Sequence, residues 1–362
     1  MKRPAVAWAL VVLALLLSGS ARGEPRYRFK LGFVIGPGTP IDVSARRLAD
    51  LVRERTGGEV EIVVFPGGQL GGERAIIEGV QLGTIDMSFT TTGAIGAFAP
   101  EFHVLDLPYL FPSYEAAYTY LDGEHGQKLL ALLDRRGIHG LAFLENGWRN
   151  FTSRKSPLRR PADLKGQRIR VMESPVYMGI VRALKATPTP MAYSEIPSAL
   201  REGVIDGQEN PAVNIYSARM FESQPYMIRD QHTYNVFIFK VNGNLWRSLP
   251  ERIRRIIEEA AIEVRDFERK LNREADDEFL RRLEAKGMQV HVPTASELDE
   301  WHAATAPVYE EARRFLGGTW VPDTLQFRRD WDAGKYRREE RAYLDRFKAI
   351  SVPLDEVMRR FR

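Results

Sequence analysis

Three short segments combine arginine or amide side chains with strand-like sequence, and such groups can bind a carboxylate. Residues 206–211 (Asp-Gly-Gln-Glu-Asn-Pro) place two acids and two amides directly after a short apolar, strand-like stretch. Arginines interrupt the strand-like residues 148–150 (Trp-Arg-Asn) and 168–171 (Arg-Ile-Arg-Val). A guanidinium can hold a carboxylate through two parallel hydrogen bonds, and it stays charged at any physiological pH. Together the three segments predict a site that receives a small carboxylic acid.

Arg170 is the first candidate for contacting this acid. It lies between Ile169 and Val171, so strand alternation places those two residues on one face and Arg168 and Arg170 on the other. Ligands of open α/β sheets gather outside the carboxyl ends of the strands, which is where Arg170 would lie. The same spacing also fits an arginine that is exposed or paired with an acid of the protein.

Arg149 and Asn210 are the next candidates. Arg149 lies where we expect the chain to pass between domains, and its alternative role is a hinge salt bridge with an acid such as Glu145. The Asn210 amide can donate and accept hydrogen bonds, although an Asn-Pro pair is also a common turn. Asp206 and Glu209 would repel a bound carboxylate, so we expect them to pair with arginines or to shape the turn.

The sequence lacks the motifs of common enzyme classes. It has no cysteine, no histidine pair at metal-ligand spacing and no His-Glu-x-x-His motif. No Gly-x-Ser-x-Gly elbow or Gly-Lys-Ser/Thr phosphate loop occurs, and residues 36–38 (Gly-Pro-Gly) lack the third glycine of a dinucleotide fingerprint. We therefore expect a binding protein rather than an enzyme, with no metal and no cofactor.

The first 23 residues predict export. Lys2 and Arg3 precede an apolar run over residues 5–17, and small residues follow, which is the pattern of a cleaved signal peptide. Cleavage after Ala21 or Gly23 removes two or three positive charges from the formal +4 and leaves about +1 to +2. Because the chain has no cysteine, we expect neither a lipid-anchored protein, which needs an acylated cysteine, nor disulfide bonds. No later apolar segment reaches the length needed to span a membrane. We place it in a bacterial periplasm.

The mature chain alternates strand-like and helix-like segments, which predicts open α/β sheets with helices on both faces. The first series comprises residues 27–34 (strand), 41–56 (helix), 60–65 (strand), 72–82 (helix) and 84–89 (strand). The second comprises 167–172 (strand), 176–184 (helix), 194–202 (helix) and 204–208 (strand), after which 236–241 is expected to return to the first sheet. The restart predicts two discontinuous domains.

A long amphipathic helix is predicted after Pro250. Apolar residues recur at steps of three and four from Ile253 to Phe279, which indicates one helix of about 35 residues and about 50 Å. That length exceeds what one domain needs, so we expect the helix to brace both. The last stretch, residues 317–362, is charged and has helical spacing over 331–347. It is either a solvated helix or an extension that packs on another subunit.

These elements define the expected architecture, a two-domain α/β clamp in which each domain is an open, mostly parallel sheet flanked by helices. Domain I comprises residues 24–147 and 236–275, and domain II comprises 148–235 and 276–316. Residues 317–362 form a charged, helical C-terminal extension.

Five ordered motifs point to one protein family. They are residues 66–73 (Pro-Gly-Gly-Gln-Leu-Gly-Gly-Glu), 105–111 (Leu-Asp-Leu-Pro-Tyr-Leu-Phe), 163–170 (Asp-Leu-Lys-Gly-Gln-Arg-Ile-Arg), 188–195 (Pro-Thr-Pro-Met-Ala-Tyr-Ser-Glu) and the 206–211 segment. From about residue 27 to about residue 293 the chain resembles the DctP family, the solute-binding proteins of tripartite ATP-independent periplasmic (TRAP) transporters. The resemblance implies a periplasmic solute-binding-protein clamp with its ligand in the cleft between the domains.

The same resemblance assigns roles to single residues. Arg170 matches the family's principal carboxylate-binding arginine, Arg149 matches the second arginine, and Asn210 matches the asparagine of the cleft. Glu73 and Thr91 match positions that touch the distal part of the ligand.

Further lining residues follow from the same alignment. Tyr193, Gln231 and His232 fall near cleft segments, and Trp148, Phe89 and Tyr193 could supply an apolar or aromatic lining. A monocarboxylate, a dicarboxylate, an oxo acid and an aromatic acid would all satisfy the arginines, so the identity of the ligand stays open.

Three functions follow from these expectations. The resemblance implies transport, in which the chain delivers a small carboxylate to the membrane permease subunits of a TRAP transporter. A sensor subunit would bind a similar acid and pass the signal to a membrane kinase, whereas a periplasmic hydrolase would need a nucleophile paired with a base. Scattered positive charge disfavours nucleic-acid binding. We expect a monomer, and a dimer through the C-terminal helix stays open.

Overall fold

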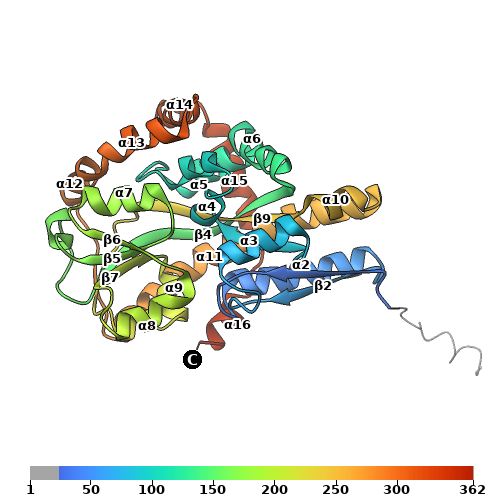
Figure 1. Ribbon diagram of the computed structural model, residues 1–362, viewed down its shortest axis with the longest axis horizontal. Coiled ribbons are helices and arrows are strands. Elements are labelled where there is room, and N and C mark those ends of the chain that lie inside the picture. Colours follow the sequence, from blue (N-terminus) through green and yellow to red (C-terminus); the bar gives the residue numbers. More distant parts are fainter. Residues whose placement is uncertain (1–23, 362) are drawn as a thin grey trace, which may run out of the picture.

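The N-terminal series forms the parallel part of the sheet. The computed structural model describes residues 24–361, so the predicted signal peptide, residues 1–23, lies outside the described residues. β1 (Tyr27–Gly32) pairs in parallel with β2 (Val60–Phe65) and β3 (Met87–Thr91), and α2 (Pro40–Arg55) and α3 (Glu73–Leu82) connect them (Figure 1). β3 begins later than predicted because Gly83, at φ 82°, ends α3 and a short connection follows.

Three helices complete this part of the molecule. α4 (Thr92–Ile95) follows β3 directly, and α5 (Tyr114–Asp122) and α6 (Glu124–Leu132) lie over β4 (Figure 1). α5 begins where the Ser113 side chain accepts a hydrogen bond from the Ala116 amide, 3.1 Å, which satisfies one free N–H of the first turn.

The second series forms a further set of strands. β5 (Arg168–Val171) pairs in parallel with β6 (Thr187–Pro190) and β7 (Gly207–Asn210), and α7 (Pro175–Ala183), α8 (Ile196–Arg201) and α9 (Ala212–Ser217) flank them. The strand predicted over 204–208 is misplaced. The polar residues 207–210 are themselves the strand, and all four are buried, because their side chains find polar partners inside the protein.

Two long antiparallel strands, β4 (Ile138–Ser153) and β9 (Thr233–Asn242), join these strands into one sheet with the order β2-β1-β3-β9-β4-β7-β5-β6. β8 (Tyr226–Ile228) pairs with β4 and with β10 (Gln289–His291). β4 pairs with β9 over residues 138–149 and with β7 and β8 over residues 150–153. A bulge at Gly147, whose φ of 113° favours glycine, lies just before this change of partner.

The change of partner divides the molecule into two lobes. We call β1, β2, β3 and β9 with α2–α6 the first lobe, and β5–β8 and β10 with α7–α9 the second lobe. The short helix α10 (Gly243–Ser248) leads into α11 (Glu251–Ala285), the predicted long helix, which contacts α2 in the first lobe and α9 in the second. The residue boundaries given above for the two domains stay a prediction. Among residues 24–361 no helix combines the length and apolar composition needed to cross a bilayer.

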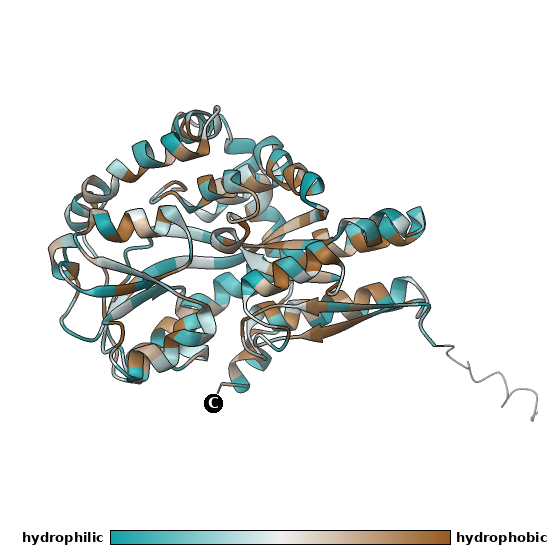
Figure 2. Ribbon diagram, in the orientation of Figure 1, coloured by the Kyte–Doolittle hydropathy of each residue, from teal (hydrophilic) through white to brown (hydrophobic). Residues whose placement is uncertain are grey.

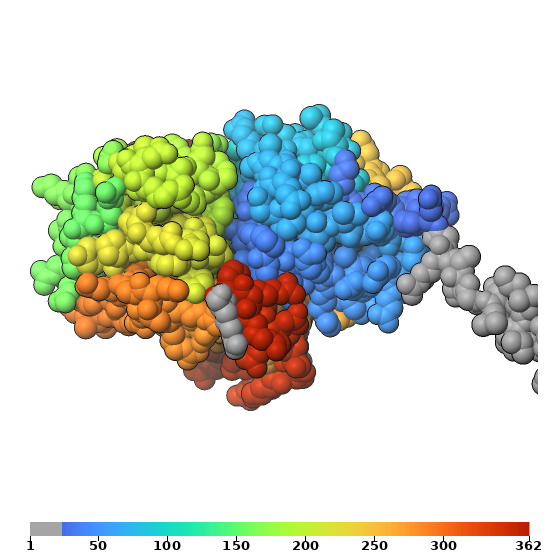
Figure 3. Space-filling view, turned by 90° about the horizontal axis from the view of Figure 1, so that it is seen from below, coloured from blue at the N-terminus to red at the C-terminus, as the bar shows by residue number. Residues whose placement is uncertain are grey.

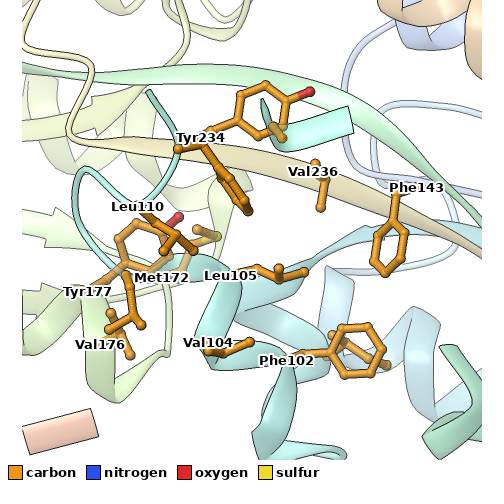
Figure 4. Close-up of a cluster of buried hydrophobic side chains, with 14 of the residues drawn as sticks. Phe102, Val104, Leu105, Leu110, Phe143, Met172, Val176, Tyr177, Tyr234 and Val236 are labelled. Carbon is orange, nitrogen blue, oxygen red and sulfur yellow. The ribbon is translucent and has the colours of Figure 1, made fainter. Parts of the chain in front are cut away.

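Hydropathy differs from strand to strand. Figure 2 shows β2 mostly in the brown of apolar residues, whereas β7 is teal. Figure 4 shows apolar side chains from both lobes in one cluster, where Met172, Val176 and Tyr177 of the second lobe face Leu105 and Tyr234 of the first. A shared apolar cluster favours the arrangement in which the lobes are in contact.

The C-terminal region folds back on its own chain. It consists of α12 (Ala295–Thr305), α13 (Pro307–Leu316), α14 (Trp320–Asp332), α15 (Arg337–Ala349) and α16 (Leu354–Arg359) (Figure 1). The helix predicted over 331–347 divides at Gly334, φ 77°. The Phe327 ring lies 5.0 Å from the Tyr120 ring, and the Phe347 ring lies 5.4 Å from the Tyr118 ring. Some of its apolar residues are therefore buried within this chain, and packing of the extension on another subunit stays a prediction.

This packing predicts a difference in stability between two residues of α15. Phe347 is buried against α5, so Phe347→Ala should lower the free energy of unfolding by about 3 kcal/mol. Leu344, exposed on the same helix, is the matched control, and Leu344→Ala should change it by less than about 0.5 kcal/mol. Urea unfolding of both variants measures this; equal small effects would mean that α15 does not pack on α5.

Candidate functional site

A cavity lies between the two lobes, and residues from both line it. A space of about 90 Å³ adjoins a narrow one of about 10 Å³, and the two share Glu73, Arg170, Met172 and Tyr193. The first lobe also contributes apolar walls at Ile35 and Ala94. The predicted residues Thr91, Arg149 and Asn210 and the unpredicted Asn146 and Asn214 complete the narrow end.

Arg170, on β5, is buried beside this cavity, with 3% of its surface exposed. Its Nε and Nη2 donate to the Met191 carbonyl oxygen at 3.1 and 2.8 Å. Within residues 24–361 the Arg170 guanidinium forms no ion pair with a carboxylate. Burial lowers its pKa to about 10, with Glu209 partly opposing this change, so the group is positively charged at neutral pH.

Arg149, on β4, differs because an acid of the protein neutralises it. Its Nε and Nη2 both donate to the Glu209 carboxylate, the latter at 2.8 Å, and its guanidinium lies over the Tyr177 ring at 5.4 Å. Burial alone would lower the pKa of Arg149, but the Glu209 charge raises it above its usual value. The suggested partner Glu145 is wrong, since it instead accepts hydrogen bonds from tyrosines such as Tyr118, 2.6 Å.

The two acids of the 206–211 segment pair with basic residues, as expected. Asp206 forms ion pairs with Arg168 and Lys155, each at 2.9 Å. Because Arg168 is bound to Asp206, Arg170 is the arginine of β5 that remains for a ligand.

Glu209 also contacts a buried histidine. His232 Nδ1 lies 2.8 Å from Asp230, and Nε2 lies 3.4 Å from Glu209. Burial alone would lower the pKa of His232, but Asp230 and Glu209 raise it to about 9, so the imidazole is charged at neutral pH. Arg149, Glu209, His232 and Asp230 thus form an alternating, neutralised row, and the charge of Arg170 is left over.

A chain of amides lines the narrow end of the cavity. Asn214 Nδ2 donates to Asn146 Oδ1 at 3.0 Å and to Asn210 Oδ1 at 3.3 Å, and Asn146 donates to Asn235 at 2.7 Å. The sequence analysis missed Asn146 and Asn214. The sequence did contain a signal for both residues. Asn146 lies inside a strand-like run and Asn214 lies shortly after Pro211, and asparagine is unusual in an apolar core.

Glu73 and Thr91 meet at the cavity as one unit. Glu73 begins α3 and accepts hydrogen bonds from the Thr91 amide at 2.6 Å and the Thr91 hydroxyl at 2.9 Å. Burial raises the pKa of Glu73, although both bonds from Thr91 oppose this change. Tyr193 faces them from the second lobe, and its hydroxyl donates to the Asn214 carbonyl at 3.3 Å. Burial raises the pKa of Tyr193 to about 12, so it remains a hydrogen-bond donor.

Three predicted residues lie elsewhere. The Trp148 ring packs on the Tyr234 ring at 5.0 Å, because adjacent strand residues point to opposite faces and Arg149 takes the cavity side. Phe89 lies in the core against Phe239, with ring centres 5.1 Å apart. Gln231 lines neither space; its backbone amide donates to Asn150 in a loop that turns through a φ of 50°. These three are corrections to the predicted lining.

The donors at the cavity suit an anion better than a metal ion. Across residues 24–361 no group of three histidine, aspartate or glutamate side chains is arranged to hold a metal. The donor groups around the cavity are the Arg170 guanidinium, asparagine amides and the Tyr193 phenol, and groups of these types can donate hydrogen bonds to a carboxylate.

Two lobes joined by two long strands and one bracing helix, with a buried cation in the cavity between them, define a clamp-type solute-binding protein. The model of the DctP family, bacterial extracellular solute-binding protein family 7, matches residues 31–314, and the chain belongs to this family.

Similar proteins agree with this assignment. The C4-dicarboxylate-binding periplasmic protein DctP of Rhodobacter capsulatus is 35% identical over 84% of this chain and 92% of its own. A TRAP periplasmic solute-binding protein of Sulfurospirillum deleyianum, solved with succinate, has a TM-score of 0.79 at 29% identity and covers 83% of this chain and 99% of its own. The sugar acid binding protein DctPAm of Advenella mimigardefordensis, solved with galactonate, has a TM-score of 0.81 at 30% identity over 84% and 98%.

The His232 contacts predict a pH dependence of stability. The folded-state pKa lies above the ordinary 6.5, so the stabilisation is fully present below pH 6.5 and is lost as the pH rises through about 9. The wild type should therefore exceed His232→Gln in unfolding free energy by more at pH 6 than at pH 9.5, by up to about 3 kcal/mol. Denaturant titrations at the two pH values measure this; a difference that does not change with pH would contradict the charged imidazole.

Proposed function

We propose that this chain is the periplasmic solute-binding subunit of a TRAP transporter and that it captures a small organic acid through Arg170. One observation carries the proposal. Among residues 24–361, the buried Arg170 guanidinium at the cavity has only the Met191 carbonyl as hydrogen-bond partner, whereas the neighbouring Arg149 is neutralised by Glu209. A buried charge without a counter-ion is unfavourable. A bound carboxylate would supply the missing charge and two parallel hydrogen bonds.

The named ligands of the relatives support a carboxylate. Succinate and galactonate, in the two solved relatives above, and D-erythronate, in a relative from Polaromonas, all carry at least one. In this chain the carboxylate would lie against Arg170 near Asn210, and the rest of the acid would extend toward Glu73, Thr91 and Tyr193. Micromolar to nanomolar affinity corresponds to about 8 to 12 kcal/mol, which one desolvated charge pair with apolar burial can supply.

Lobe closure would couple capture to delivery. Arg170 and Tyr193 belong to the second lobe and Glu73 and Thr91 to the first, so a ligand touches both walls only when the lobes are together. A ligand shifts an equilibrium by its difference in affinity for the two states, so the acid favours the closed form. The membrane permease would recognise the closed form, after signal-peptide cleavage has released the chain into the periplasm.

A hydrolase is disfavoured by the geometry of a buried serine-histidine-aspartate group, Ser174, His103 and Asp106. Ser174 Oγ lies 3.1 Å and Asp106 Oδ2 lies 3.0 Å from the same nitrogen, His103 Nδ1. A catalytic histidine needs its nucleophile and its orienting acid on different ring nitrogens. These three side chains also line neither part of the cavity. A sensor role would use the same closure, and a pull-down of the membrane partner separates it from transport.

Substitution of Arg170 tests the proposal. Arg170→Ala should abolish binding of the acid and Arg170→Lys should weaken it strongly, because an ammonium cannot supply the two-pronged geometry. A thermal-shift screen of succinate, galactonate, D-erythronate and related acids first finds a ligand, which at 100 times its dissociation constant stabilises the wild type by about 2.7 kcal/mol. Calorimetric titration of the variants then measures affinity.

Arg168→Ala is the matched control, since Arg168 lies on the same strand but is half-exposed and bound to Asp206. It should retain wild-type affinity. Unchanged affinity in Arg170→Ala would contradict the assignment, and so would equal losses in both variants.

A further inference from the structure

The end of the chain lies beyond the part that defines the family. The family model stops at residue 314, and the two solved relatives match 98–99% of their own chains with only 83–84% of this one. Residues 315–361 run from the end of α13 through α14 and α15 to α16, and they pack on this chain rather than extending away from it.

This segment crosses the molecule from lobe to lobe. Its first residues end α13, and this helix packs on α7 of the second lobe, where a Cβ at Gly179 would lie 3.7 Å from Val308. α14 and α15 then cover α5 and α6 of the first lobe, and the Phe347 carbonyl accepts from Lys270 of α11 at 2.8 Å. Residues 350–361 then leave the first-lobe helices and reach the boundary between the two lobes. Figure 3 shows the red C-terminal residues lying across the boundary between the yellow and orange second-lobe side and the blue first lobe.

α16 is anchored on the second lobe and on the end of α11. Val357 and Met358 are buried in the apolar cluster that contains Phe279. The Met358 carbonyl accepts a hydrogen bond from Arg282 Nη1 at 3.0 Å, and the Phe361 carbonyl accepts one from the Tyr216 hydroxyl at 3.3 Å. These contacts bury apolar area and satisfy the Met358 carbonyl in the last turn of α16 and the Phe361 carbonyl beyond it, so α16 is firmly attached.

The same residues touch the first lobe. Arg360 covers Gly38 so closely that a Cβ there would lie 3.2 Å from the Arg360 Cδ atom, and Gly38 has a φ of 83°. Val43 of α2 packs against the apolar cluster that holds α16. Gly38 belongs to the loop that follows Ile35, and Ile35 lines the narrow end of the cavity. The C-terminal contact therefore reaches a loop that is continuous with the cavity wall.

We propose that residues 350–361 form a strap that ties the two lobes together and sets how readily the clamp opens. The strap goes beyond ligand binding, although it rests on the lobe closure proposed above. Its contacts with Gly38 and Val43 exist only while the lobes are close, whereas its anchor on Phe279 and Arg282 persists. The strap therefore raises the closed population before any acid binds. A higher closed population raises apparent affinity in proportion.

The strap is tested by measuring the distance between the lobes in the absence of ligand, with and without the strap residues. Because the sequence has no cysteine, Leu82→Cys on α3 and Arg201→Cys on α8, both exposed, give two clean sites for spin labels, one on each lobe. We expect a chain that ends at Ile350 to show a longer and broader distance distribution by pulsed electron resonance than the full mature chain. Superimposable distributions from the two folded chains would overturn the proposal.

Point variants cover the case in which the shortened chain fails to fold. Arg360→Ala combined with Phe361→Ala should also lengthen the distance. Arg359→Ala, at the exposed last residue of α16, should not. Circular dichroism checks that each variant is folded; folded double variants with the wild-type distribution would overturn the strap.

Adding succinate, galactonate or D-erythronate to the labelled full chain tests closure separately. Shortening of the distance by any of them supports the proposed function. An unchanged distance with every acid would count against lobe closure on binding. The comparison of the full and shortened chains without ligand would still decide whether the strap ties the lobes.

Discussion

Burying an arginine guanidinium away from water is costly unless an anion lies against it. Arg170 is buried between the lobes, and in the part of the chain that the structure describes its guanidinium bonds to the Met191 carbonyl and to no carboxylate. Glu209 is held by Arg149 and His232, and Asp206 by Arg168. The protein thus pairs Arg149, His232 and Arg168 with acids, whereas the Arg170 guanidinium faces the cavity without an ion pair among the described residues.

The fold follows from the need to enclose that charge with two walls that can separate. β4 runs from the first lobe into the second and changes partner between Arg149 and Asn150, shortly after the Gly147 bulge, and the chain returns to the first lobe at β9. α11 contacts α2 on one side of this change and α9 on the other. Two strands and one helix therefore connect the walls, and the lobes otherwise meet through side chains around the cavity and through the C-terminal residues.

The sequence predicted the local features well because they depend on local patterns. Apolar periodicity predicted α11 over its full length, and the alternation of strands and helices predicted the α/β class. The motifs predicted Arg170, Arg149, Asn210, Glu73, Thr91 and Tyr193, all of which line the cavity. Features set by tertiary contacts were missed or wrong. Trp148 was assigned to the wrong face of β4. The strand was predicted over residues 204–208, whereas β7 consists of the polar residues 207–210. The burial of α15 against Tyr118 has no local signal, because the sequence of this helix is highly charged. Which arginine is neutralised also depends on the distance between β4 and β7, which no local pattern contains.

The most direct test of this account is a crystal structure of the protein with its bound acid. The account predicts a carboxylate against the Arg170 guanidinium, with two nitrogen-to-oxygen distances of about 2.7 to 2.9 Å, while Arg149 remains paired with Glu209. An acid whose carboxylate lies away from Arg170, or an Arg170 that pairs with a carboxylate of the protein itself, would contradict it.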